Sequence, residues 1–254
     1  MNDQGKLHNI MMGDCLEVMA LMPDNCVDLI LCDLPYGTTA CAWDSVIPFT
    51  QLWEQYKRVI KPTGAVVLTG SQPFTSTVVM SNIEMFKYCL VWEKSRPTGH
   101  VHAKNKPMKK HEDVVVFSPG TTVHASQSKN RMTYNPQGLV RKSVPAIRKA
   151  GGGSDSVMST RPSHKDSLQE FEGYPDSILR FASEGKTVHP TQKPVALMEY
   201  LIRTYTNDGD VVLDNCMGSG TTGVACINTG RYFMGIEKDE KYFNIAKERI
   251  QAAY

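Results

Sequence analysis

Short apolar runs alternate with amphipathic stretches over the first 117 residues. The run Val27–Cys32 has a turn on each side, which is typical of a buried strand. Apolar side chains recur at helical spacing from Phe49 to Ile60, and Pro62-Thr63-Gly64 then ends the pattern. Further strands are expected at residues 65–69, 86–92 and 113–117. Strands that alternate with helices predict an α/β fold, with a mostly parallel sheet covered on both faces.

This regularity is lost between about residues 118 and 186, where Ser, Thr, Asn, Gly and Pro dominate. The run Gly151-Gly152-Gly153-Ser154 has the composition of a flexible hinge. Because a structureless loop of this length is uncommon inside a compact domain, we interpret the region as an inserted subdomain or as a loop that becomes ordered on a partner. The alternation then resumes, with helices expected at 194–205, 220–229 and 240–252 and strands at 211–214 and 232–237.

The composition is that of an ordinary globular protein: 254 residues, 41% hydrophobic and 21% charged. It excludes collagen-like, mucin-like and wholly disordered chains. No apolar run reaches the roughly 18 residues that a membrane span needs, and the polar N-terminus argues against a secretory signal. The seven cysteines form no C-x-x-C pair. We therefore expect free thiols in a reducing cytoplasm, without a zinc site or a disulfide framework.

The charge is unevenly distributed, although the net charge is only +2. Between Lys87 and Lys149 there are thirteen Lys and Arg against three acids, so the rest of the chain carries a net charge of −8. Four of the seven histidines fall in the same stretch. A local excess of this size suits contact with a phosphate backbone. A solvated lysine-rich loop has the same composition, so charge alone leaves both interpretations open.

A glycine loop follows the predicted strand Val211–Asp214. Gly218 and Gly220 allow tight turning and close approach of a ligand. Together with Gly223 they match the G-x-G-x-x-G fingerprint of dinucleotide sites. Glu237 ends the next predicted strand, where a carboxylate can accept hydrogen bonds from both hydroxyls of a ribose. The loop indicates an adenosine cofactor but does not choose between NAD and S-adenosylmethionine, and a glycine turn used only for packing is the structural alternative.

A second motif, Asp33-Leu34-Pro35-Tyr36-Gly37, directly follows the strand predicted at Val27–Cys32. In open α/β sheets ligands bind outside the carboxyl ends of the strands, and this turn lies at such an end. Turns rich in Asp, Pro and Gly are common, so the four-residue pattern alone is weak. Its place after a buried strand, in a chain that also has an adenosine-type loop, makes it a candidate catalytic turn.

Asp33-Leu34-Pro35-Tyr36 and Asp214-x-x-x-Gly218-Ser219-Gly220-Thr221-Thr222 together resemble the S-adenosylmethionine-dependent amino-methylating DNA methyltransferases, which methylate adenine N6 or cytosine N4. The order of the motifs resembles the permuted class called beta. The resemblance implies a doubly wound, mostly parallel, seven-stranded Rossmann-like sheet. It also implies three parts: a catalytic half at residues 1–117, an inserted target-recognition region at 118–186 and a cofactor-binding half at 187–254.

The resemblance also implies the residues that hold the cofactor. Gly13-Asp14 resembles the family's contact to the adenine ring, in which Asp14 accepts from the exocyclic amine. His189-Pro190-Thr191-Gln192-Lys193-Pro194 is similar to the segment before the cofactor-capping helix. The full set implied to bind S-adenosylmethionine is Asp14, Asp33, Lys193, Pro194, Asp214, Cys216, Met217, Gly218, Ser219, Gly220, Thr221, Thr222 and Glu237.

Amino methylation explains the residue types of the catalytic turn. The exocyclic amine is a poor nucleophile and the methyl sulfonium a strong electrophile, so the enzyme mainly has to position them. Asp33 and the backbone carbonyl of Leu34 or Pro35 can accept both amine N–H groups, and Tyr36 can stack on a base swung out of the duplex. Leu34 stands where the family usually has proline, a position that contributes mainly shape. No metal is expected.

The expected partner is double-stranded DNA, and backbone contacts are predicted for Arg131, Arg141, Lys142, Arg148 and Lys149. Adenine is favoured over cytosine because family members that act on cytosine more often carry Ser in place of Asp33. An NAD-dependent oxidoreductase is the alternative of a different class, but it leaves the catalytic turn and the basic stretch without a use. A non-catalytic DNA-binding protein is a third. The resemblance also implies that a homodimer can form, and it suggests the cytoplasm of a bacterial or phage-infected cell.

Overall fold

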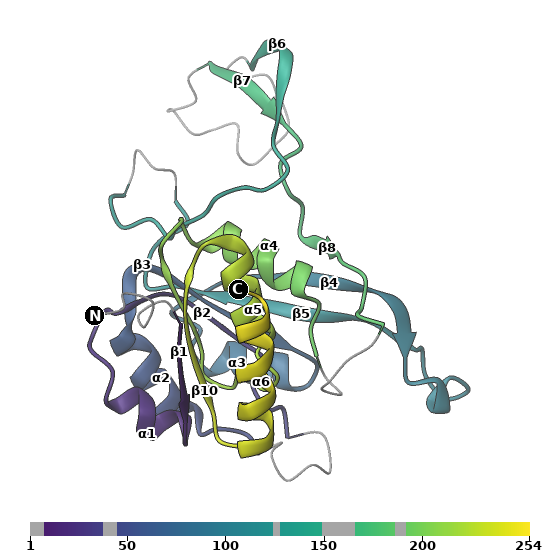
Figure 1. Cartoon of the computed structure of the whole chain (residues 1–254). Coiled ribbons are helices and arrows are strands. Elements are labelled where there is room, and N and C mark those ends of the chain that lie inside the picture. The colour runs from purple at the N-terminus through teal and green to yellow at the C-terminus, as the bar shows by residue number, and fades with distance from the viewer. Residues whose placement is uncertain (1–7, 38–44, 124–127, 149–165, 186–191) are drawn as a thin grey trace. The chain divides into compact units, whose positions relative to one another are not determined.

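The computed structural model describes residues 8–37, 45–123, 128–148, 166–185 and 192–254 (Figure 1). The chain divides into two compact units, a larger one of Met1–Asn135 with Ser177–Tyr254 and a smaller one of Pro136–Asp176. The smaller unit lies within the region expected to be inserted. The functional boundaries expected at residues 118 and 186 stay predictions, as does the hinge at Gly151–Ser154, which lies outside the described residues.

The described part of the larger unit holds an eight-stranded sheet in the order β1-β10-β9-β2-β3-β5-β4-β8. Every neighbouring pair is parallel except the two that β5 makes with β3 and β4. The strands are β1 (His8–Met12), β2 (Val27–Cys32), β3 (Ile60–Gly70), β4 (Phe86–Thr98), β5 (Lys109–Phe117), β8 (Ile178–Arg180), β9 (Val211–Asp214) and β10 (Tyr232–Glu237). The residue pattern predicted six of these strands, and the resemblance implied seven. The edge strands β1 and β8 were not predicted from the pattern; β8 has only three residues, too few for a periodicity to appear.

Helices cover both faces of this sheet. They are α1 (Cys15–Ala20), α2 (Phe49–Val59), α3 (Phe74–Ser81), α4 (Val195–Tyr205), α5 (Thr221–Thr229) and α6 (Glu240–Ala252). One hydrophobic core contains side chains of α1, α2 and α3, and a second contains side chains of α4, α5 and α6. Successive residues of β2 alternate between the two cores: Ile30 belongs to the first, and Leu29 and Leu31 belong to the second. A strand buried on both faces explains why its sequence is a continuous apolar run.

The chain leaves the two central strands in opposite directions. β2 pairs with β9 through Leu29 with Val212 and Ile30 with Leu213. After β9 the chain continues through α5 to β10 on one side, and after β2 it continues through α2 to β3 on the other. Ligands of open α/β sheets bind outside the carboxyl ends of the strands at such a reversal. The sequence placed its two motifs at these two strand ends, and the pairing of β2 with β9 confirms that they are neighbours.

All the helices and strands that the pattern predicted in the larger unit are present, and β3 is longer than predicted. It begins at Ile60 and includes Pro62, which the sequence marked only as a stop for the preceding helix. Its register with β2 shifts between the Val27–Ile60 and Leu29–Ala65 pairs. A bulge tolerates proline because the missing N–H is not required for pairing there.

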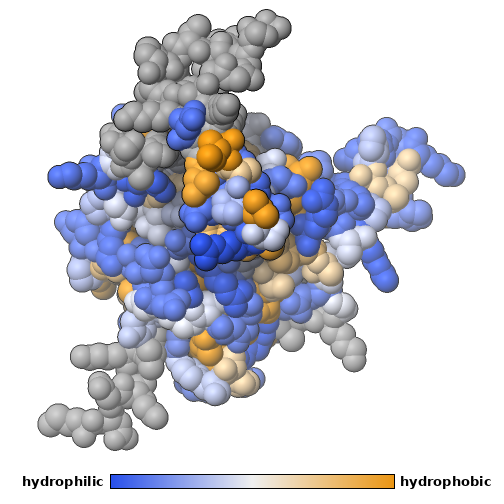
Figure 2. All heavy atoms as spheres, turned by 90° about the horizontal axis from the view of Figure 1, so that it is seen from above, coloured by the Kyte–Doolittle hydropathy of each residue, from blue (hydrophilic) through white to orange (hydrophobic). Residues whose placement is uncertain are grey.

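The smaller unit contains the antiparallel pair β6 (Val140–Arg148) and β7 (Ser167–Glu172), which the sequence did not predict. None of the helices in the described parts of the chain is long and apolar enough to cross a membrane. On the face seen from above, hydrophilic side chains predominate and hydrophobic ones form separate patches (Figure 2). The six described cysteines are free; Cys41 lies outside these residues.

Candidate active site

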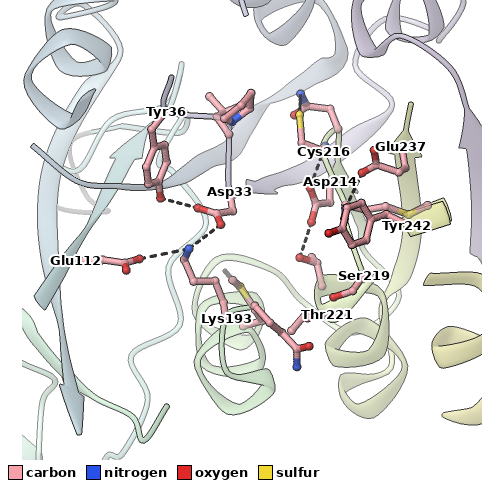
Figure 3. A pocket seen from close by; sticks show the side chains of 18 of the residues that line it. Asp33, Tyr36, Glu112, Lys193, Asp214, Cys216, Ser219, Thr221, Glu237 and Tyr242 are labelled. Atoms are coloured by element: carbon pink, nitrogen blue, oxygen red, sulfur yellow. Dashed lines mark hydrogen bonds and ion pairs between the residues drawn. The ribbon is translucent and has the colours of Figure 1, made fainter. Parts of the chain in front are cut away.

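A pocket with a volume of about 540 Å³ lies where the catalytic turn and the glycine loop meet (Figure 3). Asp33, Leu34, Pro35 and Tyr36 line it from the end of β2. The loop after β9 and Glu237 at the end of β10 line another part, and β4 and β5 contribute a third. Segments nearly two hundred residues apart in sequence therefore form one cavity.

Most residues implied to hold a cofactor line this pocket. They are Asp14, Asp33, Lys193, Asp214, Cys216, Met217, Gly218, Ser219, Thr221, Thr222 and Glu237. The two that do not, Pro194 and Gly220, are the residues before the first turns of α4 and α5. They set the direction in which these helices leave the pocket.

The two glycines of the loop have different tasks, although both adopt left-handed backbone angles (φ 50° at Gly218 and 78° at Gly220). A Cβ on Gly218 would meet no atom within 4 Å, so its lack of a side chain leaves open space. A Cβ on Gly220 would lie 3.0 Å from the Cβ of Ala246 on α6. Gly220 is therefore required by the turn and by helix packing, whereas Gly218 leaves room for a ligand.

Carboxylates hold the glycine loop in place. Glu237 accepts hydrogen bonds from the backbone N–H of Gly218 at 2.8 Å and of Asp239 at 2.9 Å. A carboxylate can accept about four hydrogen bonds, so each Glu237 oxygen keeps a site for a hydroxyl. Asp214 is buried and accepts from the Thr222 hydroxyl at 2.6 Å and the Cys216 N–H at 3.2 Å. Burial raises the pKa of Asp214 to about 6, against the opposing effect of these two donors.

Arg249 on α6 is a supporting residue that the sequence did not indicate. Its guanidinium donates to the Ser219 carbonyl at 2.6 Å and to the Ser219 hydroxyl at 2.8 Å, and it lies 3.4 Å from the Thr221 hydroxyl. Asp14, by contrast, was expected from the sequence. Its side chain caps α1 by accepting from the Leu16 N–H at 2.9 Å, and it lines the pocket.

Three donors surround the carboxylate of Asp33, and Figure 3 shows two of them, Tyr36 and Lys193. Its Oδ1 accepts from the Tyr36 hydroxyl at 2.5 Å and from the Thr69 hydroxyl. Its Oδ2 accepts from the Lys193 ammonium at 2.6 Å. Thr69, near the end of β3, was missed by the sequence analysis. This arrangement fixes the carboxylate in one orientation.

Lys193 is almost fully buried between two carboxylates, with a side chain 6% exposed. Its Nζ lies 3.3 Å from Glu112 Oε2, in addition to the contact with Asp33, and Glu112 also pairs with Lys94. Burial acts to lower the pKa of Lys193, but the two carboxylates outweigh it and the pKa lies above its usual value. Lys193 is therefore a fixed positive charge beside Asp33. The resemblance implied a cofactor contact for Lys193, whereas Glu112 and Lys94 were given no role in the site.

The ring of Tyr36 is stacked on Phe74, with centroids 4.8 Å apart and planes at 30°. Phe74 covers one face in this way, and Lys193 Nζ lies over the ring, 5.9 Å from its centroid. Burial raises the pKa of the Tyr36 hydroxyl, which remains a donor to Asp33. Leu34 is buried in the first hydrophobic core, which agrees with the shape-filling part expected of it.

The residues predicted to contact DNA are distributed over both units. Arg141, Lys142 and Arg148 lie on β6 of the smaller unit, and Arg141 is 3.6 Å from Glu170. Arg131 belongs to the larger unit, and Lys149 lies outside the described residues. Their contacts with DNA stay predictions. In the parts of the chain that the structure describes, no three His, Cys, Asp or Glu side chains are grouped in a way that could hold a metal ion.

Comparison with known proteins identifies the family to which this chain belongs. A DNA methylase family model (N6/N4 methyltransferases) matches residues 27–248. The type II methyltransferase M.HpaI of Haemophilus parainfluenzae is 27% identical over 255 residues, which cover 95% of this chain and 74% of the relative. The crystal structure of the M1.HpyAVI–SAM complex matches with a TM-score of 0.62 and 26% identity, covering 96% of this chain and all of the other.

The PvuII DNA methyltransferase, described as cytosine-N4-specific, has a TM-score of 0.68 at 16% identity, covering 98% of this chain and 90% of that one. At this identity the likeness shows the fold alone. The family match extends from β2 to α6 and includes both motifs that line the pocket. The chain therefore belongs to the N6/N4 DNA methylase family, whose members methylate an amino group of adenine or cytosine in DNA.

Proposed function

We propose that the protein transfers a methyl group from S-adenosylmethionine to the exocyclic N6 amine of adenine in double-stranded DNA, after the base has swung out of the helix. The observation that carries this proposal is the single pocket shared by the Asp33 turn and the glycine loop. Asp33 favours adenine over cytosine through the family resemblance, since cytosine-specific members more often have Ser at this position.

The part of the pocket around the glycine loop fits an adenosine-containing methyl donor. Gly218 leaves open space, and Glu237 keeps acceptor sites suited to ribose hydroxyls. Asp14 lines the same pocket, and we assign its carboxylate to the adenine amine of the donor. Bound there, S-adenosylmethionine supplies an electrophilic methyl group, and the chain's own residues have to present the amine to it.

Asp33 and the backbone beside it present the amine. A carboxylate has about four lone-pair sites, and Tyr36, Thr69 and Lys193 occupy three of those on Asp33. The remaining site can accept one N–H of the target amine, and the carbonyl of Leu34 or Pro35 can accept the other. These two hydrogen bonds favour a nitrogen lone pair that is localised on the amine and points at the methyl group. After transfer the amine is cationic and acidic, so it loses its proton readily and Asp33 need not deprotonate it beforehand.

Tyr36 provides the surface on which the target base stacks. The face opposite Phe74 can contribute about 1–3 kcal/mol of stacking, which is comparable to the cost of extruding the base. Phe74 supports the covered face, and the bond to Asp33 fixes the ring relative to the amine acceptor. The base is therefore oriented by the same turn that holds its amine.

The identity of the methylated base can be tested directly. The protein is incubated with labelled S-adenosylmethionine and unmethylated genomic DNA, and the DNA is then digested to nucleosides and separated. We expect the label in N6-methyladenine because Asp33 occupies the first position of the catalytic turn. Label found only in N4-methylcytosine would reject adenine as the substrate and leave the amino-methylation chemistry intact.

A second test concerns the glycine loop. Arg249→Met removes three donor contacts to Ser219 and Thr221, and we expect it to raise KM for S-adenosylmethionine about tenfold with little change in kcat. Arg58→Met is the matched control, since Arg58 also holds backbone by donating to carbonyls, those of Met19 and Met22, but these two residues do not line the pocket. An equal rise in KM in both variants would show that general loosening of the fold, rather than loss of the contacts to the glycine loop, raises KM.

A further inference from the structure

The paired strands β4 and β5 extend from the sheet as an arm of the larger unit (Figure 1). We call residues 95–111 the hairpin arm. Pairing continues into it through Glu93 with His111 and Thr98 with Lys109. The turn at its tip is held by backbone hydrogen bonds, from the N–H of His102 to the Gly99 carbonyl at 2.9 Å and from the N–H of Lys106 to the His102 carbonyl at 3.0 Å. The arm therefore has a defined shape without a partner.

The hairpin arm carries one sign of charge. It contains five Lys and Arg and no Asp or Glu, and every residue from 95 to 108 is exposed. Lys109 contacts the Ser71 hydroxyl and Lys110 pairs with Glu93 at 2.8 Å, so these two serve the base of the arm. Within the described residues Arg96, Lys104 and Lys106 form no ion pair. Cations concentrated in this way favour an anionic partner.

The base of the arm is also a wall of the active-site pocket. Arg96 and Thr98 line the pocket together with Trp92 and Lys94 of β4. A nucleotide whose base enters the pocket remains joined to its neighbours through phosphates, which have to pass the mouth of the pocket. From Trp92 to Thr98 the strand spans six steps, about 20 Å at roughly 3.3 Å per residue, which is more than half of one turn of duplex at about 34 Å.

We propose that the hairpin arm binds the phosphate backbone of the DNA beside the extruded base, with Arg96 at the mouth of the pocket and Lys104 and Lys106 farther out. This inference rests on the proposed function of the pocket. It adds a contact surface distinct from the basic residues of β6, and it uses backbone charge rather than base identity. Its contribution to affinity is therefore independent of sequence.

The test is the salt dependence of binding to a fluorescent 30-base-pair duplex of arbitrary sequence, followed by anisotropy. Each phosphate contact contributes about 0.9 to the slope of log K against log salt. Lys104→Gln combined with Lys106→Gln should therefore make the slope about 1.8 less negative. Lys57→Gln combined with Lys247→Gln changes the net charge equally, at exposed positions on α2 and α6, and should leave the slope near that of the wild type.

Two parallel measurements separate this proposal from that of the pocket. S-adenosylhomocysteine binding should be unchanged in both double variants, which verifies that they are folded. If the wild-type protein methylates DNA while the arm variant keeps the wild-type slope, the arm proposal is overturned and the pocket proposal stands. If the slope of the arm variant becomes less negative as expected but the wild-type protein methylates no DNA, the arm proposal is supported and the pocket proposal fails.

Discussion

Asp33→Ala is expected to reduce methyl transfer about a thousandfold or more while leaving cofactor binding largely intact. The substitution removes the acceptor that three donors hold in the pocket, and removing one such preorganised polar group costs about 10² to 10³ in rate in well-studied enzymes. We expect the larger effect because the two hydroxyls and Lys193 lose their common partner as well. Glu237 and the glycine loop, which form the donor side, are not altered.

Single-turnover transfer from labelled S-adenosylmethionine measures the rate, and calorimetry with S-adenosylhomocysteine measures binding. Asp24→Ala serves as the control, since it removes a carboxylate whose side chain is 67% exposed and which does not line the pocket. Wild-type transfer by the Asp33 variant would refute the role assigned to this residue. Loss of binding together with transfer would mean that Asp33 mainly supports the cofactor.

Lys193→Met is expected to lower transfer about a hundredfold. The variant removes the cation that lies 2.6 Å from Asp33 and 3.3 Å from Glu112, while Glu112 keeps its contact with Lys94. Asp33 loses the donor that holds its Oδ2, so the carboxylate is no longer fixed in the orientation that presents the amine. Single-turnover transfer measures the loss.

The wild-type protein should keep its rate at high pH. The two carboxylates raise the pKa of Lys193, so its charge is present below the ordinary lysine value and is lost only as pH rises through the higher value of the folded protein. Transfer should show no loss attributable to this group up to at least about pH 10. Lys193→Arg keeps a positive charge and should restore part of the rate. Wild-type transfer by the methionine variant, with only a lower melting temperature, would show that Lys193 has a structural role alone.

The sequence predicted the centre of the sheet and both motifs because each depends on local pattern. Val27–Cys32 and Val211–Asp214 are apolar runs followed by turns, and their strand ends are neighbours in a doubly wound sheet. Thr69 could have been found in the same way, since it closes the apolar run of the next strand. The contact of Lys193 with Asp33 joins residues 160 positions apart, and no periodicity encodes it.

Other parts of the site gave no signal at all. Arg249 lies on α6. The spacing of apolar residues in this helix indicates which face is buried, but it does not indicate which loop the opposite face contacts. Glu112 follows a charged stretch that is typical of a solvent-exposed segment. Its side chain is nevertheless only 14% exposed and lies between two lysines. The edge strand β8 is too short to show alternation. Residues that act through contacts with distant parts of the chain, rather than through their place in a local pattern, could be identified only from the structure.

The seam between β2 and β9 has a consequence for how such proteins can evolve. The segment that holds the methyl donor and the segment that holds the base meet there through two pairs of strand residues, and each then continues away from the other. Nothing in that junction depends on which segment the ribosome makes first. Exchanging their order along a gene would preserve the same chemistry, provided that the strands still align side by side.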